Sequence, residues 1–519
     1  MTKPKHRPNV CIDDARGWSR MLGRALRVIL PILSLLASTV AFGQATDPFA
    51  AEPGEFLVEI QSDADLDAFL ERWDATLLGV SETVLRIRVD GDDEQLLELL
   101  EDDESVVDVS PNHRQHTPEA VRQMVLGAFG GTFSEYAEQD VAGQIGIDMA
   151  HESSRGAGVV VAILDTGIDP LHELFRSNIA PGWDFVDSDP QPWEERHGLD
   201  EDEDGAIDEG FGHGSMVAGL VRLVAPEATL LPVRILDDEG RGDAFRVVQG
   251  IRFAVDNGAD VINLSLGAPY TIAIVRKAVQ AAHDAGVLVV ASAGNNDQPG
   301  PAYCPANVPE AIMVTGVDPT DVKASFADYH PSVAISAPSV GLRSAYPFGS
   351  WAIGDGCSFA TPLVSGGAAL IRSVRPEVDP ASLTVLVQTS VQSIDHLPAN
   401  QPYAGRLGTG RLFLPLGLGE TTDVPGPDTR QAGVALQVIP NPAAGSVGLT
   451  LQGRIPTGTS RLEALDASGR VVYVDPSFDG HSDWSFTACD GVSLPAGTYF
   501  LRVLDGTTVV AEGRVVRVR

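Results

Sequence analysis

The chain has 519 residues, of which 44% are hydrophobic, so it is long enough to form two or three domains. Its 71 acidic and 36 basic residues give a formal net charge of −35, which argues against nucleic acid and against anionic membrane surfaces as partners. Arginine supplies most of the positive charge, because lysine occurs only at Lys3, Lys5, Lys277 and Lys323.

Residues 1–43 have the pattern of a secretory signal peptide. Several arginines precede an apolar run from Val28 to Ala41, and small residues near Gly43 suit a signal peptidase. The run is short for a membrane-spanning helix, and no later segment has the length and apolarity to be one. We therefore expect export, with Met21 as an alternative start, and a secreted or cell-surface protein.

Residues 52–116 form a unit of their own in which strand and helix patterns alternate. The predicted strands are 55–60, 84–89 and 106–112, and the predicted helices are 66–73 and 94–100. This order predicts a small α+β domain ahead of the main part of the chain.

Residues 135–420 alternate short apolar strands with helices. The predicted strands are 159–165, 229–235, 261–266, 287–292 and 312–317, and the helices between them include 245–257 and 272–285. Such alternation predicts an α/β fold with a parallel sheet and helices on both of its faces.

An acidic segment, residues 200–209, interrupts this pattern. Its carboxylates recur two residues apart around a turn glycine, as in the first half of an EF-hand-like calcium loop, although Phe211 stands where that loop's last glutamate is expected. A structural calcium ion is the cofactor that this spacing predicts, and a merely solvated acidic loop is the alternative. The candidate ligands are Asp200, Asp202, Asp204, Asp208 and Glu209.

Three turns of the α/β region carry residues suited to acyl transfer. Asp165 ends a buried strand, His213 lies among glycines at the start of a helix, and Ser358 opens another helix of small, apolar residues. A helix N-terminus favours negative charge that develops beside it, which suits a serine nucleophile. Asp–His–Ser is one of three known chain orders for such a triad.

With the segment Ser292-Ala293-Gly294-Asn295, these motifs resemble the subtilisin-like serine proteases, or subtilases, over residues 135–420. The resemblance implies an endopeptidase in which Ser358 attacks, His213 transfers the proton and Asp165 orients His213. It also implies that Asn295 and the Ser358 N–H bind the oxyanion. An inactive protease scaffold with a surface or adhesion role is the alternative.

The resemblance extends to the parts that bind peptides. Two segments are similar to those that pair with an extended substrate, namely Ser265-Leu266-Gly267 and Gly240-Arg241-Gly242, so that Ser265, Leu266, Gly267, Gly240 and Gly242 are expected to bind substrate. Residues 52–116 are similar to the inhibitory propeptides of the family, with cleavage expected between 113 and 135; a permanent N-terminal domain is the alternative. We expect a monomeric enzyme acting on proteins or peptides, with its own propeptide as inhibitor, either as a broad scavenger or as a narrow processing enzyme.

Three cysteines follow the predicted signal peptide. In subtilases, the segment around Cys304 lines the primary specificity pocket near the nucleophile, so the resemblance implies a disulfide between Cys304 and Cys357. A free thiol beside the nucleophile is the alternative.

Residues 421–433 have the composition of a linker, and residues 434–519 alternate as short strands of a β-sandwich. The segments 440–443, 469–472 and 494–500 resemble C-terminal sorting domains of the type IX secretion system. This resemblance implies a contact with secretion machinery or the cell surface, and a binding or spacer sandwich is the alternative.

Overall fold

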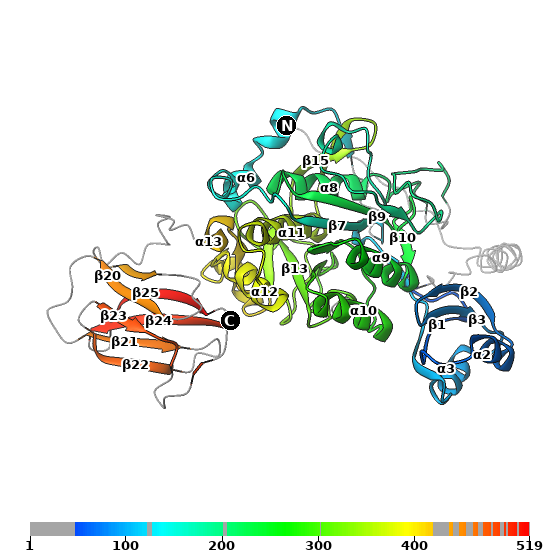
Figure 1. The fold of residues 1–519 in the computed structure, drawn as a ribbon. Helices are drawn as coiled ribbons and strands as arrows, with labels where there is room; N and C mark the ends of the chain where they lie inside the picture. Colours follow the sequence, from blue (N-terminus) through cyan, green and yellow to red (C-terminus); the bar gives the residue numbers. More distant parts are fainter. Residues whose placement is uncertain are drawn as a thin grey trace, which may run out of the picture. The chain divides into compact units, whose positions relative to one another are not determined.

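The computed structural model describes residues 47–121, 127–200, 205–300 and 303–418 and, beyond them, most of 435–517 (Figure 1). In the last range, residues 440–445, 453–459, 466–470, 479–480, 488–492, 495–496 and 506–507 are not described. The predicted signal peptide also lies outside the described residues. Within the described parts, no helix has the length and apolarity needed to cross a membrane.

The N-terminal unit is a four-stranded antiparallel sheet covered by two helices. The strands are β1 (Glu55–Ile60), β2 (Thr76–Ser81), β3 (Val84–Arg88) and β4 (Val106–Pro111), in the order β2-β3-β1-β4, and the helices are α2 (Leu66–Trp73) and α3 (Asp93–Glu101). Asp65 and Asp92 cap the two helices by accepting backbone N–H bonds. Strand β2 was not predicted from the sequence, because it is a largely exposed edge strand without alternating burial.

A nine-stranded sheet forms the centre of the following region. The strands are β7 (Val160–Asp165), β8 (Trp183–Asp184), β9 (Thr229–Arg234), β11 (Val261–Leu264), β12 (Leu288–Ser292), β13 (Ala311–Val317), β14 (Ile335–Pro338), β17 (Val391–Gln392) and β18 (Arg411–Leu412). Their order is β17-β18-β14-β13-β12-β11-β7-β9-β8, and all neighbours are parallel except β17 and β18. The predicted parallel sheet is confirmed. The strands that were not predicted are β8, β17 and β18 near its edges and β14, which lies between β13 and β18.

Helices cover both faces of this sheet, as predicted (Figure 1). On one face, α8 (His213–Val224), α11 (Cys357–Val374) and α12 (Pro380–Thr389) share an apolar core with alternate strand residues such as Val161. On the other, α9 (Ala244–Asp256) and α10 (Ala273–Asp284) pack against the intervening residues such as Ala162. Because successive side chains of a strand point to opposite faces, each strand contributes to both cores.

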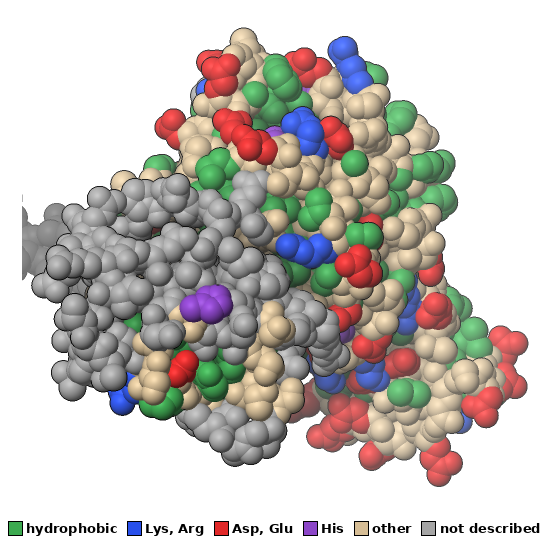
Figure 2. Space-filling view, turned by 60° about the vertical axis from the view of Figure 1, so that its left-hand side comes forward, with side chains coloured by type: hydrophobic (Ala, Val, Ile, Leu, Met, Phe, Trp, Pro, Cys, Tyr) green, Lys and Arg blue, Asp and Glu red, His purple; other side chains and the backbone are tan. Residues whose placement is uncertain are grey.

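Short elements complete this region. They are β5 (Arg114–His116), α4 (Pro118–Val121), β6 (Gly127–Phe129), α5 (Phe133–Ala137), α6 (Asp140–Ile145), α7 (Ile147–Ala150), η1 (Glu173–Phe175), β10 (Arg241–Asp243), β15 (Leu342–Tyr346), β16 (Ser350–Gly354), η2 (Pro398–Tyr403) and α13 (Leu414–Leu418). Strands β15, β16 and β6 form a small antiparallel sheet, and β5 pairs with β10. Acidic side chains are spread widely over the face seen in Figure 2, in keeping with the net charge of −35.

The C-terminal residues form two antiparallel sheets. One holds β19 (Ala435–Ile439), β20 (Val447–Gln452) and β23 (His481–Trp484); the other holds β21 (Ser460–Leu465), β22 (Val471–Phe478), β24 (Gly497–Asp505) and β25 (Thr508–Arg517). The rings of Trp484 and Tyr499 meet edge to face at 5.6 Å and join the cores of the two sheets. The predicted β-rich C-terminal unit is therefore present, while the resemblance segment 440–443 and residues 469–470 lie outside the described residues.

Candidate active site

Asp165, His213 and Ser358 lie where a strand or a helix begins or ends. Asp165 is the last residue of β7, His213 is the first residue of α8, and Ser358 is the second residue of α11. All three side chains are buried, and the Nδ1 atom of His213 lies 2.7 Å from Oδ1 of Asp165. The same Asp165 oxygen accepts the Thr166 N–H at 2.8 Å, which fixes the carboxylate facing the imidazole.

Asn295 lies in the segment that follows β12, and its side chain reaches the start of α11, next to Ser358. Its Oδ1 accepts the Cys357 N–H at 2.8 Å, so the amide is anchored to the helix that carries Ser358. This bond leaves Nδ2 as the donor that is directed at the centre of the site. Gly356 lets the groups come together, since a Cβ there would lie 3.2 Å from Nδ2 of Asn295.

The side chain of Glu119 occupies the centre of this site. Its Oε1 accepts from Nδ2 of Asn295 at 2.7 Å, and its Oε2 accepts from the Ser358 hydroxyl at 2.7 Å. Oε2 also lies 3.3 Å from Nε2 of His213. One carboxylate thus contacts the predicted nucleophile, general base and oxyanion donor together.

These contacts determine the charge of the buried histidine. Burial opposes the positive form of His213, but the carboxylates of Asp165 and, secondarily, Glu119 outweigh it and raise the pKa to about 10. The imidazole is therefore protonated at neutral pH while Glu119 is in place. In that form it cannot accept the proton of Ser358.

The residues just before Glu119 lie extended between the two segments predicted to bind substrate. Strand β5 pairs antiparallel with β10, which places Gln115 opposite Gly242. His116 exchanges two backbone bonds with Gly267, at 3.3 and 3.0 Å, and the Thr117 N–H donates to the Gly240 carbonyl at 3.0 Å.

The other two predicted binding residues, Ser265 and Leu266, are buried next to Gly267. The Ser265 hydroxyl donates to the Ser358 carbonyl at 2.8 Å while its own carbonyl accepts from the Ser358 hydroxyl at 3.2 Å. The structure thus brings the five predicted binding residues to residues 115–117 and Ser358, and we refer to the surface that these five residues form as the groove.

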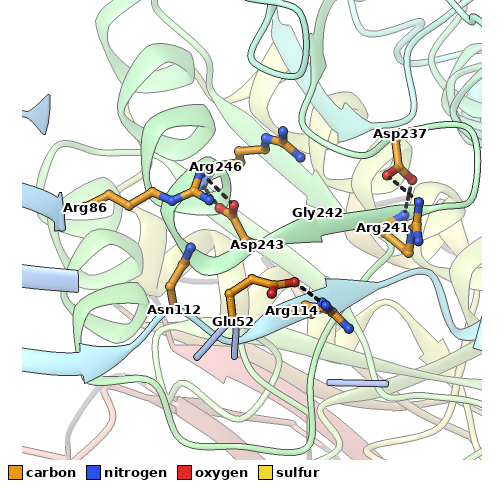
Figure 3. A pocket seen from close by; sticks show the side chains of 9 residues that line it. All are labelled: Glu52, Arg86, Asn112, Arg114, Asp237, Arg241, Gly242, Asp243 and Arg246. Atoms are coloured by element: carbon orange, nitrogen blue, oxygen red, sulfur yellow. Dashed lines mark hydrogen bonds and ion pairs between the residues drawn. The ribbon is translucent and has the colours of Figure 1, made fainter. Parts of the chain in front are cut away.

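A cavity of about 270 Å³ lies beside this paired strand (Figure 3). Arg86 of the N-terminal unit reaches Oδ2 of Asp243 at 3.3 Å across the cavity, while Arg114 pairs with Glu52. Arg241 pairs with Asp237 at 3.4 Å on the opposite wall. Ion pairs therefore line the seam between the N-terminal unit and the groove.

The predicted calcium ligands do not form a site among the described residues. Asp202 and Asp204 lie outside those residues, and no three His, Cys, Asp or Glu side chains of the described parts converge on one point. Oδ2 of Asp200 accepts the Gly205 N–H at 3.0 Å, and the carboxylate of Glu209 is buried. Burial and a hydrogen bond with Asp238 raise the pKa of Asp208.

The expected disulfide between Cys304 and Cys357 is not formed, and both thiols are free and buried. Cys304 packs in the core on the α9–α10 face of the sheet. Cys357 packs instead with Ala324 and Ala327. The family-based expectation was wrong because the two side chains belong to different apolar clusters.

Two carboxylates of the site were missed by the sequence analysis. Glu119 lies in a short polar segment, and only the three-dimensional pairing of the preceding strand carries it to Ser358. Glu194 binds the first turn of α8, accepting the N–H groups of Gly212 and Ser215, both at 2.9 Å. It comes from a loop 19 residues before His213, a separation that no motif in this sequence signals.

Comparison with known proteins places this geometry in a family. The subtilase family model, peptidase S8, matches residues 156–419, about half of the chain. Thermitase of Thermoactinomyces vulgaris is 37% identical over 234 residues, which are 43% of this chain and 78% of that protein. An alkaline protease of Shouchella clausii is 32% identical over 370 residues, which are 67% of this chain and 90% of that protein.

Among solved structures, a cold-adapted subtilisin-like serine proteinase matches with a TM-score of 0.44 and 28% identity, over 50% of this chain and 90% of that one. The family match covers the strands and helices that carry Asp165, His213, Asn295 and Ser358. The chain therefore belongs to the subtilase family and is a subtilisin-like serine endopeptidase.

Proposed function

We propose that the protein is a secreted endopeptidase zymogen that cleaves itself and then hydrolyses peptide bonds in other proteins. The observation that carries this proposal is the contact of the Glu119 carboxylate with Ser358, Asn295 and His213. An active site that is filled by its own chain is the arrangement expected of a latent protease.

Once Glu119 has left the active site, the three triad residues have the following roles. Ser358 attacks the scissile carbonyl, and His213 takes the hydroxyl proton and later gives it to the leaving amine. Asp165, at 2.7 Å from Nδ1 of His213, holds the tautomer and stabilises the imidazolium. Nδ2 of Asn295 and the Ser358 N–H stabilise the oxyanion of the tetrahedral intermediate, which then collapses to the acyl-enzyme.

Residues 52–116 act as the inhibitory propeptide in this proposal. Strand β5 lies in the groove in the extended form that a substrate takes, which is the basis of competition with substrate. The unit is also tied to the catalytic region by Lys277, which bonds Glu59 at 2.7 Å and Asp108 at 2.8 Å. Cleavage between 113 and 135 frees the groove once the unit dissociates.

Export and sorting follow from the ends of the chain. Residues 1–43 direct secretion, and residues 434–519 act as a β-sandwich sorting domain after the linker 421–433. The support is the arginine-led apolar run at the N-terminus and the two antiparallel sheets at the C-terminus. The predicted outcome is an extracellular or surface-attached enzyme.

A structural calcium ion in the acidic loop is part of the proposal. The spacing of the carboxylates supports it, as does the closeness of Asp208 and Asp238, which both accept the His197 N–H, since two carboxylates held this close repel unless a proton or a cation intervenes. Removing calcium with EDTA is expected to lower both the melting temperature and the activity. Unchanged values would rule the ion out.

The decisive experiment compares the intact mass of the wild-type chain with that of Ser358→Ala in calcium buffer. We expect only the wild type to split between residues 113 and 135, because the variant lacks the nucleophile. Processing of both proteins would show that another protease cuts the chain. If both stay whole and the wild type hydrolyses no peptide, self-activation is wrong and an inactive scaffold with a surface role takes its place.

A further inference from the structure

Glu194 lies in the loop that joins β8 to α8, and its carboxylate is turned to the first turn of the helix that begins with His213. Oε2 accepts the Gly212 N–H and Oε1 accepts the Ser215 N–H, both at 2.9 Å. The Thr166 hydroxyl bonds the same carboxylate at 3.2 and 3.3 Å. Each of these partners is next to, or two residues from, a triad residue.

The helix needs this carboxylate because it cannot cap itself. The N-cap residue is Gly212, with φ 88° and no side chain to accept an N–H. A larger residue does not fit, since a Cβ at Gly212 would lie 2.3 Å from the Tyr346 ring. An acceptor must therefore come from elsewhere in the chain, and a carboxylate at a helix N-terminus also gains from the helix dipole.

The remaining N–H groups of this turn are bound by neighbouring residues. The His213 N–H donates to the Gly210 carbonyl at 3.0 Å, and the Gly214 N–H donates to the Thr166 hydroxyl at 2.9 Å. Thr166 follows Asp165 directly, so one pair of side chains, Thr166 and Glu194, ties the end of β7 to the start of α8. That tie connects the backbone segments that carry Asp165 and His213, whose side chains meet at 2.7 Å.

We propose that Glu194 is a positioning residue for catalysis, whose ionised carboxylate holds the first turn of α8, and with it the backbone of His213, beside Asp165. This inference rests on the triad roles proposed above. The proposed role is separate from metal binding in the acidic loop, because Glu194 lies before residues 200–209 and its contacts are with Thr166, Gly212 and Ser215.

The two bonds from Glu194 to the helix depend on its ionisation, and this ionisation falls near neutral pH. Burial and the charge of Asp165 raise its pKa to about 7, against the backbone N–H bonds that lower it. The titratable groups that face it are Asp165 from β7 and Tyr346 from β15, whose own pKa is raised by burial and by Glu194. As the pH falls below about 7, Glu194 takes up a proton and one of its oxygens no longer accepts a helix N–H.

The test is the pH dependence of kcat and KM, measured with a soluble peptide substrate and the enzyme that the full-length chain yields by self-processing. In Glu194→Gln, one acceptor oxygen becomes a donor that faces an N–H group, and the charge is lost. We expect kcat to fall about tenfold, the scale of one lost helix cap, with KM unchanged. We also expect the acidic limb of the profile to move to lower pH, because the variant has no group at position 194 that is protonated near pH 7 and then loses its contact with the helix.

Glu195→Gln is the matched control, since it removes the adjacent charge from a side chain that contacts Arg234 at 3.8 Å. It should leave both kcat and the acidic limb unchanged. Wild-type kcat and acidic limb in Glu194→Gln would overturn the inference. So would a loss of kcat that follows a fall in melting temperature while the acidic limb stays in place, because a purely structural role would do this.

If Glu194→Gln does not fold, Glu194→Asp replaces it, since it keeps the charge but shortens the reach. We expect Glu194→Asp to have the same acidic limb as the wild type and a lower kcat. An unchanged kcat in this variant would contradict the positioning role. Ser358→Ala, measured in parallel, distinguishes failure of the triad assignment from failure of the inference about Glu194. Activity that survives in Ser358→Ala refutes the triad, whereas a wild-type profile in the Glu194 variants refutes only this inference.

Discussion

The carboxylate of Glu119 accepts a hydrogen bond from the Ser358 hydroxyl at 2.7 Å. The nucleophile is therefore hydrogen-bonded to the N-terminal segment instead of to its general base. The other oxygen of the same carboxylate takes the side-chain donor of Asn295 at 2.7 Å. A carboxylate in this position binds the donors that an oxyanion would use, but it has no bond for the serine to break. Inhibition and recognition therefore use the same atoms.

Replacing Glu119 is expected to open the active site of the full-length chain. In Glu119→Ala, Ser358 and His213 are no longer held by the carboxylate, so a serine-directed phosphonate should label Ser358 at least tenfold faster. Glu119→Gln should be intermediate, because an amide oxygen still accepts hydrogen bonds but carries no charge to pair with His213. Labelling rates measured before processing check this.

Glu138→Gln is the control, since this exposed glutamate lies in the same part of the chain and bonds only Ser134. Its labelling rate should equal that of the wild type. Equal rates in Glu119→Ala and the wild type would contradict the role of Glu119.

The inhibition should weaken as the pH rises. With Glu119 in place, His213 is protonated up to a pKa of about 10, raised against burial by Asp165 and Glu119. Loss of Glu119 from the site removes one of these carboxylates, so His213 then has a lower pKa. Docking of Glu119 therefore binds a proton, and this contribution is complete below the lower pKa and lost as the pH rises through about 10.

The measurement is the ratio of labelling rates in wild type and Glu119→Ala, which cancels the intrinsic pH dependence of Ser358. The ratio should approach one as the pH rises from neutral toward about 10. A ratio that is constant over this range would show that no proton accompanies docking.

Asn295 is expected to serve catalysis and inhibition through the same amide. Asn295→Ala should lower kcat by about 10²–10³-fold, the loss known for one such oxyanion donor in subtilisin. Asn295→Asp keeps an acceptor for the Cys357 N–H, bonded at 2.8 Å in the native chain, but sets a like charge against Glu119. It should therefore lose kcat, and its labelling rates before and after processing should differ less than those of the wild type, because the N-terminal segment inhibits it less. Its melting temperature should stay near that of the wild type.

The parts of the site that follow a local motif could be predicted from the sequence. Asp165 ends an apolar strand, and His213 and Ser358 open helices of small residues, so each lies on a regular element whose position follows from the pattern. The parallel sheet followed in the same way from alternating apolar runs. Strand β2 did not, because an exposed edge strand lacks the alternation that marks a buried face.

The contacts that depend on tertiary structure could not be predicted. Glu119 reaches Ser358 only because β5 pairs with β10, and the pairing of two short strands far apart in sequence leaves no local pattern. Glu194 caps a helix from outside it, so it lacks the spacing of a capping residue. The disulfide failed as a prediction for the same reason, since nearness to a common pocket does not fix the direction of two side chains.

The two cysteines are expected to be reduced and protected in the native enzyme. Burial raises the pKa of Cys304 to about 12 and raises that of Cys357 as well, so neither forms the thiolate that alkylating reagents need. Iodoacetamide should leave the native activity intact, yet modify both residues once the chain is unfolded without reductant. Peptide masses that show Cys304 linked to Cys357 would contradict the free thiols.

Docking of the N-terminal unit should depend on Lys277. Its ammonium bonds Glu59 at 2.7 Å and Asp108 at 2.8 Å, and these two carboxylates raise its pKa against the effect of burial. The site is partly exposed, so each pair contributes only about 0.2–1 kcal/mol and is screened by salt. Lys277→Met should therefore weaken inhibition by the released unit a few-fold at low salt, and high salt should reduce the difference.

Arg276→Met is the control, because it removes a charge from an exposed neighbour on α10. Inhibition constants measured with the processed enzyme would refute the contact if both variants behaved alike.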